Sequence, residues 1–96
     1  MKPSEALNQH RADIRRIVAA NRVINPRVFG SVARGEDADG SDLDLLVDPT
    51  PETSLLDIGI IQDALVNLLG IDVDVLTPKA LPASFRATVI AEAVPV

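Results

Sequence analysis

The sequence contains no cysteine, tryptophan or tyrosine, and its only aromatic residues are Phe29 and Phe85. Without cysteine the chain forms no disulfide and no thiolate metal site, which fits a reducing compartment. Two phenylalanines are too few for a surface on which the bases of single-stranded nucleic acid stack. No apolar run approaches the ~20 residues of a membrane span, and the N-terminus lacks the apolar region of a signal peptide. We therefore expect a cytoplasmic protein with no membrane association.

Basic residues are also scarce. Nine Lys and Arg stand against fourteen Asp and Glu, which gives a formal net charge of −5. The phosphate backbone of nucleic acids is bound mainly through cationic side chains, so we expect no direct nucleic-acid partner. Aliphatic residues, by contrast, are plentiful, and hydrophobic residues make up 47% of the 96 positions. That content predicts one folded domain over residues 1–96 with a modest core.

Hydrophobic periodicity and turn residues predict a short series of helices and strands. A helix capped by Ser4 is expected over residues 5–20. A second helix begins after Ser54 and ends at Gly70, and its apolar positions are numerous enough to bury most of its surface. After a break at Pro26, strands are expected at 27–29, 42–47 and 71–76, a final helix at 83–92 and an edge strand at 94–96. This order predicts an α/β fold, a small mixed β-sheet with helices packed on one face.

Two aspartates separated by one leucine begin the second of these strands. Residues i and i+2 of a strand project from one face about 6.6 Å apart, so Asp42 and Asp44 point together while Leu43 enters the core. Carboxylates at this spacing suit hard divalent cations such as Mg²⁺, although alternating acids also occur on solvated strands. If the third strand lies beside this one, Asp74 joins the cluster, and Asp72 competes for that place because it points the same way. Three carboxylates are enough for a two-metal site.

A Gly-Ser pair at the end of the first strand stands ten residues before these acids. A strand that turns there into a short helix presents free backbone N–H groups, and such groups bind phosphate. Gly30 allows a phosphate to approach the backbone closely, and the Ser31 hydroxyl can donate a hydrogen bond to it. Arg34 adds a planar cation suited to phosphate oxygens, or it pairs structurally with Glu36 or Asp42. The turn and the acids together therefore favour a site that binds a triphosphate and metal ions.

These motifs resemble those of the nucleotidyltransferase superfamily that includes DNA polymerase beta. The resemblance rests on Gly30-Ser31, the Asp42-x-Asp44 pair ten residues later, and the sequence Val-Asp-Val at 73–75. The segments 30–36, 41–47 and 74–78 are similar to the minimal nucleotidyltransferase (MNT) group, and so is the length of the chain. The combination of motifs is specific, whereas neither motif alone would be. The similarity extends from residue 5 to residue 95.

The resemblance implies both a fold and a function. Members of the family have a small α/β core and use Mg²⁺ to move a nucleoside monophosphate from a nucleoside triphosphate to an acceptor. MNT proteins are commonly antitoxins paired with a helical HEPN ribonuclease toxin, and some transfer AMP to a tyrosine of that toxin. For this chain the resemblance implies ATP as substrate, two Mg²⁺ ions as cofactors, Asp42, Asp44 and Asp74 as catalytic metal ligands, and Gly30, Ser31 and Arg34 as the nucleotide-binding residues.

The acceptor of the transfer is the least determined part of this interpretation. The chain has no second helical domain of the kind that binds the acceptor in larger nucleotidyltransferases, so we expect an oligomer or a complex with a HEPN toxin. Two other functions stay open. The protein could be a binding-only antitoxin that blocks the toxin sterically, with vestigial carboxylates, or it could modify a small molecule such as an aminoglycoside. The presence of all three acids favours the enzyme over the binding-only antitoxin. The missing acceptor domain disfavours transfer to a small molecule.

Overall fold

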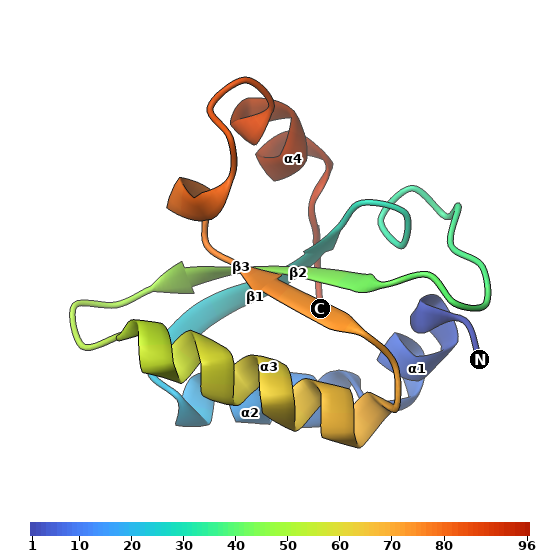
Figure 1. Cartoon of the computed structure of the whole chain (residues 1–96), viewed down its shortest axis with the longest axis horizontal. Coiled ribbons are helices and arrows are strands. Elements are labelled where there is room, and N and C mark those ends of the chain that lie inside the picture. Colours follow the sequence, from blue (N-terminus) through green and yellow to red (C-terminus); the bar gives the residue numbers. More distant parts are fainter.

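The computed structural model describes residues 1–96 as a four-stranded mixed sheet flanked by helices (Figure 1). The sheet order is β3-β2-β1-β4; β1 pairs antiparallel with β2 and β4, whereas β2 and β3 are parallel. This architecture confirms the expected mixed α/β fold. The strands are β1 (Val23–Phe29), β2 (Leu43–Pro49), β3 (Val73–Leu76) and β4 (Val94–Pro95). The helices are α1 (Pro3–Gln9), α2 (Arg11–Ala20), α3 (Leu55–Leu69), the 3₁₀ turn η1 (Pro78–Ala80) and α4 (Arg86–Glu92).

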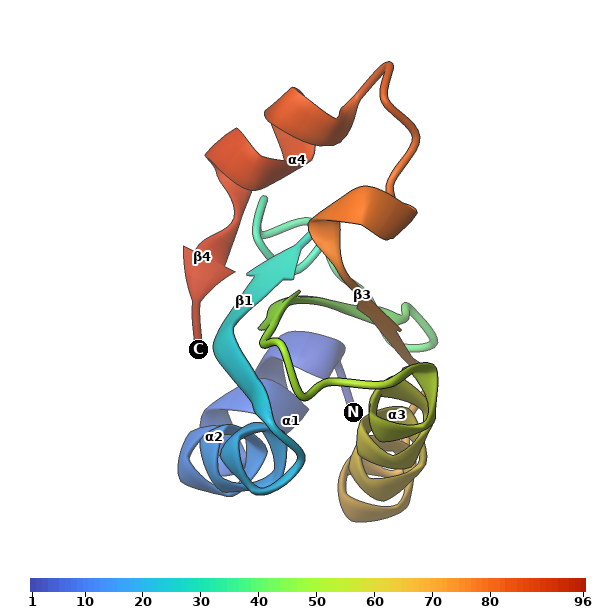
Figure 2. The ribbon, with the colours of Figure 1, turned by 90° about the vertical axis from the view of Figure 1, so that its left-hand side faces the viewer.

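The two faces of the sheet are covered differently. Helices α1, α2 and α3 pack on one face, as expected, and side chains from all three join the main core (Figure 2). Alternation along β2 sends Leu43 and Leu45 into this core, where both are fully buried. Helix α4 and the η1 turn lie on the opposite face, where Leu46 of β2 joins Val89 of α4 in a second, smaller core. Side chains at odd positions of β2 therefore pack in the main core, whereas those at even positions face the layer of α4 and η1.

The N-terminal helix is divided where one helix over 5–20 was expected. Lys2 rather than Ser4 is the N-cap of α1, so the helix begins earlier than expected. The chain leaves helical geometry at His10, whose φ is −130°, and α2 follows at once. The ring of His10 and the carboxylate of Asp13, 3.2 Å apart, brace this junction. No glycine or proline marks the break in the sequence.

Strand β1 runs through a proline that was expected to end the preceding segment. It begins at Val23 rather than Arg27, and its pairing with β2 shifts register between Ile24 and Arg27. Asn25 adopts a left-handed conformation with φ +57° in this bulge. Proline has no N–H to donate, and the bulge leaves Pro26 out of the pairing with β2. The irregularity thus lets the strand continue past a residue that usually breaks strands.

Helix α3 begins and ends as predicted. The Ser54 hydroxyl accepts from the Asp57 N–H (3.3 Å), the Asp57 carboxylate accepts from the Ser54 N–H (2.9 Å), and Gly70 ends the helix with φ +70°. Asp57 is almost fully buried and also pairs with the guanidinium of Arg22, just beyond α2. Hydrogen bonds from Arg22, then from Ser54, hold the pKa of Asp57 below its ordinary value. One carboxylate therefore joins the start of α3 to the end of α2.

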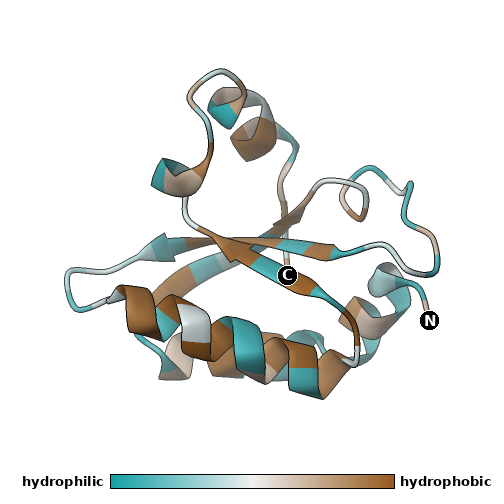
Figure 3. Ribbon diagram, in the orientation of Figure 1, coloured by the Kyte–Doolittle hydropathy of each residue, from teal (hydrophilic) through white to brown (hydrophobic).

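The outer side of α3 is more exposed than its composition suggested. Leu55 and Leu56 leave 91% and 71% of their surface exposed, whereas Ile61 and Leu65 face the core and are fully buried. Figure 3 shows hydrophobic residues along much of the helix. The expectation that α3 buries most of its surface is therefore wrong, because the sheet covers only one stripe of it. None of the helices combines the length and the apolar character that crossing a membrane requires.

Candidate active site

Of the three predicted aspartates, Asp44 and Asp74 lie side by side on neighbouring strands, and Asp42 directly precedes β2. Asp44 and Asp74 are direct partners in the parallel pairing of β2 with β3. Their neighbours along each strand, among them Leu43 and Val73, are buried in the main core, so the acids point to the opposite face. Asp44 is half-buried, whereas Asp42 and Asp74 are exposed. The parallel pairing thus places Asp44 beside Asp74, and Asp42 is near enough for its charge to act on Asp44.

Asp44 is the centre of this group. Burial raises the pKa of the Asp44 carboxyl, the negative charges of Asp74 and Asp42 raise it further, and Arg34 acts in the opposite direction. Asp44 is therefore close enough to sense both other acids. A carboxylate that is disfavoured by burial and by like charges is stabilised by a nearby cation. The electrostatics of Asp44 are those of a residue that gains from binding a metal ion.

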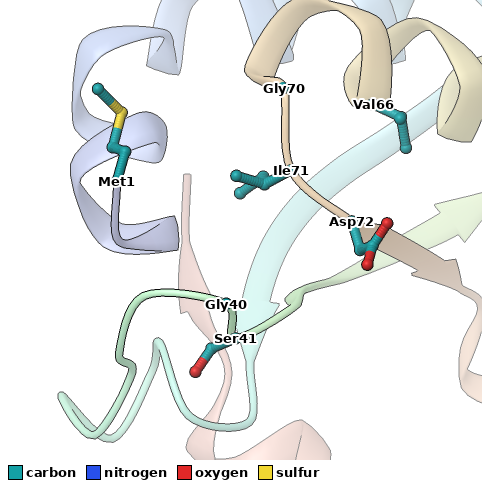
Figure 4. Close-up of a pocket in the computed structure, with 7 residues that line it drawn as sticks. All are labelled: Met1, Gly40, Ser41, Val66, Gly70, Ile71 and Asp72. Carbon is teal, nitrogen blue, oxygen red and sulfur yellow. The ribbon is translucent and has the colours of Figure 1, made fainter.

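Asp72 has a different environment from Asp74. A hollow of about 510 Å³ opens where β2 and β3 begin, and Asp72 lies on its wall (Figure 4). Asp74 does not line this hollow, and Asp72 is not among the groups that shift the pKa of Asp44. The structure therefore separates two acids that strand alternation could not. The wall consists of Met1, Gly40, Ser41, Val66, Gly70, Ile71 and Asp72.

The Gly-Ser turn follows β1 directly and packs against Asp44. Gly30 has φ +70°, and a Cβ atom added to it would lie 2.4 Å from Oδ2 of Asp44. Such a contact is too short, so only glycine leaves the Asp44 carboxylate in this place. The sequence suggested Gly30 for the approach of a phosphate. Its second role, which sequence reasoning missed, is to make room for the central acid.

The turn after Gly30 leaves a row of backbone N–H groups without backbone partners. The Glu36 N–H donates to the carbonyl of Ser31 (2.8 Å), which helps to close a helix-like turn. The amides of Ser31, Val32 and Ala33 donate to no backbone carbonyl. These are the first N–H groups of a helical turn, and groups of this kind bind phosphate oxygens. The donors predicted for a triphosphate are therefore present beside Asp44.

Arg34 is held by two carboxylates. Its Nε lies 3.4 Å from Glu36 and its Nη1 lies 3.2 Å from Glu92, at the end of α4. Of its two possible structural partners, Glu36 is therefore used and Asp42 is not. Glu92 also accepts a hydrogen bond from the Gly30 N–H (3.2 Å). Nothing in the sequence singled out Glu92, because no local pattern connects residues so far apart along the chain.

The chemistry of the acids fits a metal ion better than their arrangement does. Asp42, Asp44 and Asp74 offer only carboxylate oxygens, the ligands that Mg²⁺ prefers. In the structure, however, no three His, Cys, Asp or Glu side chains are gathered closely enough to surround one ion. The metal site stays a prediction that this donor set supports.

Comparison with known proteins agrees with this architecture. A family model described as nucleotidyltransferase domain matches residues 7–96. The protein adenylyltransferase MntA of Thermococcus cleftensis is 34% identical over 88 residues, which cover 92% of this chain and 86% of that protein. A solved minimal nucleotidyltransferase structure matches with a TM-score of 0.86 and 40% identity over 97% of this chain and 95% of the other.

A toxin–antitoxin structure with AMP-PNP shares the fold, with a TM-score of 0.70 and 16% identity over 97% of this chain and 71% of the other. At that identity the likeness concerns the fold alone. The family model and the MntA relative, by contrast, each span nearly the whole chain. They confirm the family resemblance that the Gly-Ser turn and the paired aspartates indicated. The chain belongs to the nucleotidyltransferase domain family.

Proposed function

We propose that this protein is a Mg²⁺-dependent nucleotidyltransferase that moves AMP from ATP to a hydroxyl group of a partner protein, namely a tyrosine of a HEPN toxin, and thereby acts as its antitoxin. The observation that carries the proposal is the position of Asp44. It pairs with Asp74 on the neighbouring strand, senses the charge of Asp42 and packs directly on Gly30. The acidic strands and the N–H-rich turn therefore meet at one carboxylate. Nucleotidyl transfer needs oxygen ligands for cations and donors for phosphates together.

Each part of the site then has a defined role. The free amides at 31–33, the hydroxyl of Ser31 and the guanidinium of Arg34 bind the triphosphate and orient its α-phosphorus. Asp42, Asp44 and Asp74 hold Mg²⁺, which when bound offsets the negative charge of the phosphates and of the leaving pyrophosphate. Asp74 also accepts the proton of the acceptor hydroxyl. As the new bond forms between that oxygen and the α-phosphorus, the bond to pyrophosphate breaks in line with it.

One comparison supports a protein acceptor. The relative from Thermococcus cleftensis, 34% identical to this chain, is named a protein adenylyltransferase. The architecture of this chain points the same way, because residues from all four helices belong to the two cores that cover the sheet. No helix is left to form a separate acceptor-binding unit within residues 1–96. Recognition of the acceptor is therefore assigned to the surface of the partner itself.

The variant Asp42→Asn separates binding of the toxin from its modification. Asp42 is a small part of any stable interface, which must bury roughly 1,200 Å² or more. The variant should therefore co-purify with the toxin but leave it unmodified and active, as judged by intact mass and by growth of cells that express both proteins. Asp63→Asn, at an exposed position of α3, is the control for the lost charge. Full protection of cells by Asp42→Asn without modification of the toxin would instead support the binding-only antitoxin.

The variant Gly30→Ala should remove transfer while the protein still folds. Alanine at φ +70° costs about 1–2 kcal/mol, and its Cβ would displace the Asp44 carboxylate. Misplacing a catalytic group by about 1 Å can reduce the rate roughly a hundredfold. Gly70→Ala is a matched control, because Gly70 has the same φ but nothing within 4 Å of the added Cβ. Thermal melts should show similar losses for both variants, and only Gly30→Ala should lose transfer; equal transfer by the two variants would contradict this role of Gly30.

A further inference from the structure

Glu92 occupies Arg34, one of the groups that the proposed function assigns to the triphosphate, and the backbone N–H of Gly30, which directly precedes the free amides of that turn. Its Oε1 accepts hydrogen bonds from the Gly30 N–H and from Nη1 of Arg34, each at 3.2 Å, and its Oε2 lies 3.5 Å from the same Nη1. A backbone N–H and a guanidinium that converge on one anionic oxygen are also the donors that bind a phosphate oxygen. The side chain of Glu92 is only 25% exposed, so this contact is partly shielded from water.

The position of Glu92 on its helix makes this contact informative. Glu92 is the last residue of α4, and the C-terminal end of a helix carries a partial negative charge that disfavours an acid. The turn and Arg34 therefore supply the attraction that holds the carboxylate here. Val89, one turn earlier, anchors α4 in the smaller core. The carboxylate can consequently leave Arg34 by rotating its own side chain, without unpacking the helix.

We propose that Glu92 is an internal competitor for the phosphates of the nucleotide. In the free protein its carboxylate accepts hydrogen bonds from the Gly30 N–H and from Arg34, and these bonds must break when a triphosphate binds. A single N–H does not serve two anions at once, and a carboxylate left beside a triphosphate is repelled by it. Glu92 thus holds the turn and Arg34 in place before binding and lowers the affinity for nucleotide. This inference rests on the proposed function, since it assumes a triphosphate at this turn.

The expected size of the effect follows from the exposure of the contact. A partly exposed ion pair with one additional charge-assisted hydrogen bond favours the state in which Glu92 contacts Arg34 and the Gly30 N–H by a factor of about five over the state in which both are free. The apparent affinity for a competing ligand equals the intrinsic affinity multiplied by the fraction of molecules whose site is free, here about one in six. Glu92→Gln keeps an acceptor for the Gly30 N–H but removes the charge that attracts Arg34. Its affinity for a triphosphate should therefore rise roughly three- to tenfold.

Isothermal titration with two probes tests the inference. The probes are α,β-methylene-ATP with Mg²⁺, which resists transfer, and inorganic tripolyphosphate, which has no base or sugar. Glu92→Gln should bind both probes more tightly than wild type by the same factor, because the competition concerns the phosphates alone. Glu52→Gln is the matched control: Glu52 is exposed in the turn between β2 and α3, and its loss changes the net charge equally. In an Arg34→Gln background the gain from Glu92→Gln should shrink, since the shared cation is gone.

The outcomes separate this inference from the proposed function. If wild type binds the probes and Glu92→Gln binds them equally or more weakly, Glu92 is no competitor and only this inference is wrong. A gain with α,β-methylene-ATP but not with tripolyphosphate would also overturn it, because Glu92 would then act on the nucleoside. If wild type, Glu92→Gln and Glu52→Gln all fail to bind either probe while their thermal melts show folded proteins, the turn binds no phosphate and the proposed function is overturned as well.

Discussion

The variant Asp44→Asn is expected to lose nucleotidyl transfer by roughly a thousandfold or more and to be at least as stable as wild type. Asparagine keeps the shape of the side chain but removes the negative charge that would hold a cation between Asp42 and Asp74. Transfer of label from α-labelled ATP, measured beside Asp63→Asn, checks the first expectation. Wild-type transfer by Asp44→Asn would contradict the metal assignment.

The stability of Asp44→Asn follows from the raised pKa of Asp44. Burial, and then the charges of Asp74 and Asp42, favour the protonated carboxyl in the folded state. A group of this kind contributes stability below its unfolded pKa, and that contribution is lost as the pH rises through the higher folded pKa. At neutral pH the ionised Asp44 therefore destabilises the fold, and asparagine removes this effect. Thermal melts should give a Tm equal to that of wild type or slightly higher at pH 7, with the difference shrinking at acid pH. A Tm well below that of wild type at pH 7 would show that the charge of Asp44 is not a cost to the fold.

The variants Asp74→Asn and Asp72→Asn should differ greatly although both acids are exposed and lie two residues apart, Asp74 within β3 and Asp72 just before it. Consecutive same-face residues are about 6.6 Å apart, whereas metal–carboxylate distances tolerate only a few tenths of an ångström. Asp74 is the register partner of Asp44 and raises its pKa, whereas Asp72 lines the neighbouring hollow. Asp74→Asn should therefore reduce kcat/KM by orders of magnitude and Asp72→Asn several-fold at most. The reverse ranking in a matched kinetic assay would assign the third ligand to Asp72.

Local patterns predicted the parts of the site that depend on strand periodicity. A strand repeats every two residues, so the side on which Asp42 and Asp44 lie could be predicted from the buried residues between them. The pairing of Asp44 with Asp74 required one more step, since it depends on β2 and β3 being parallel neighbours. A helix between two strands commonly makes that connection, and α3 does so here. This part of the site could therefore be anticipated, although not its register.

The contacts that could not be predicted join residues from separate elements. The fit of Gly30 against Asp44 depends on how the turn after β1 meets β2, and the ion pair of Arg34 with Glu92 depends on where α4 ends. No spacing rule reports either contact. The exposure of Leu55 has the same origin: apolar content shows that a helix has hydrophobic residues, but only the layers of the fold show which of them are covered. Sequence periodicity thus predicts which residues share one face of a helix or strand. Only the tertiary structure shows what packs against that face.

The central claim is that the site transfers a nucleotidyl group and not a phosphoryl group. The most direct measurement incubates the protein and its co-purified partner with Mg²⁺ and ATP labelled either at the α-phosphate or at the γ-phosphate. We expect covalent label on the partner from α-labelled ATP only, release of pyrophosphate, and no label with the Asp44→Asn protein. Label from γ-labelled ATP, or α-label transferred equally well by Asp44→Asn, would contradict this claim.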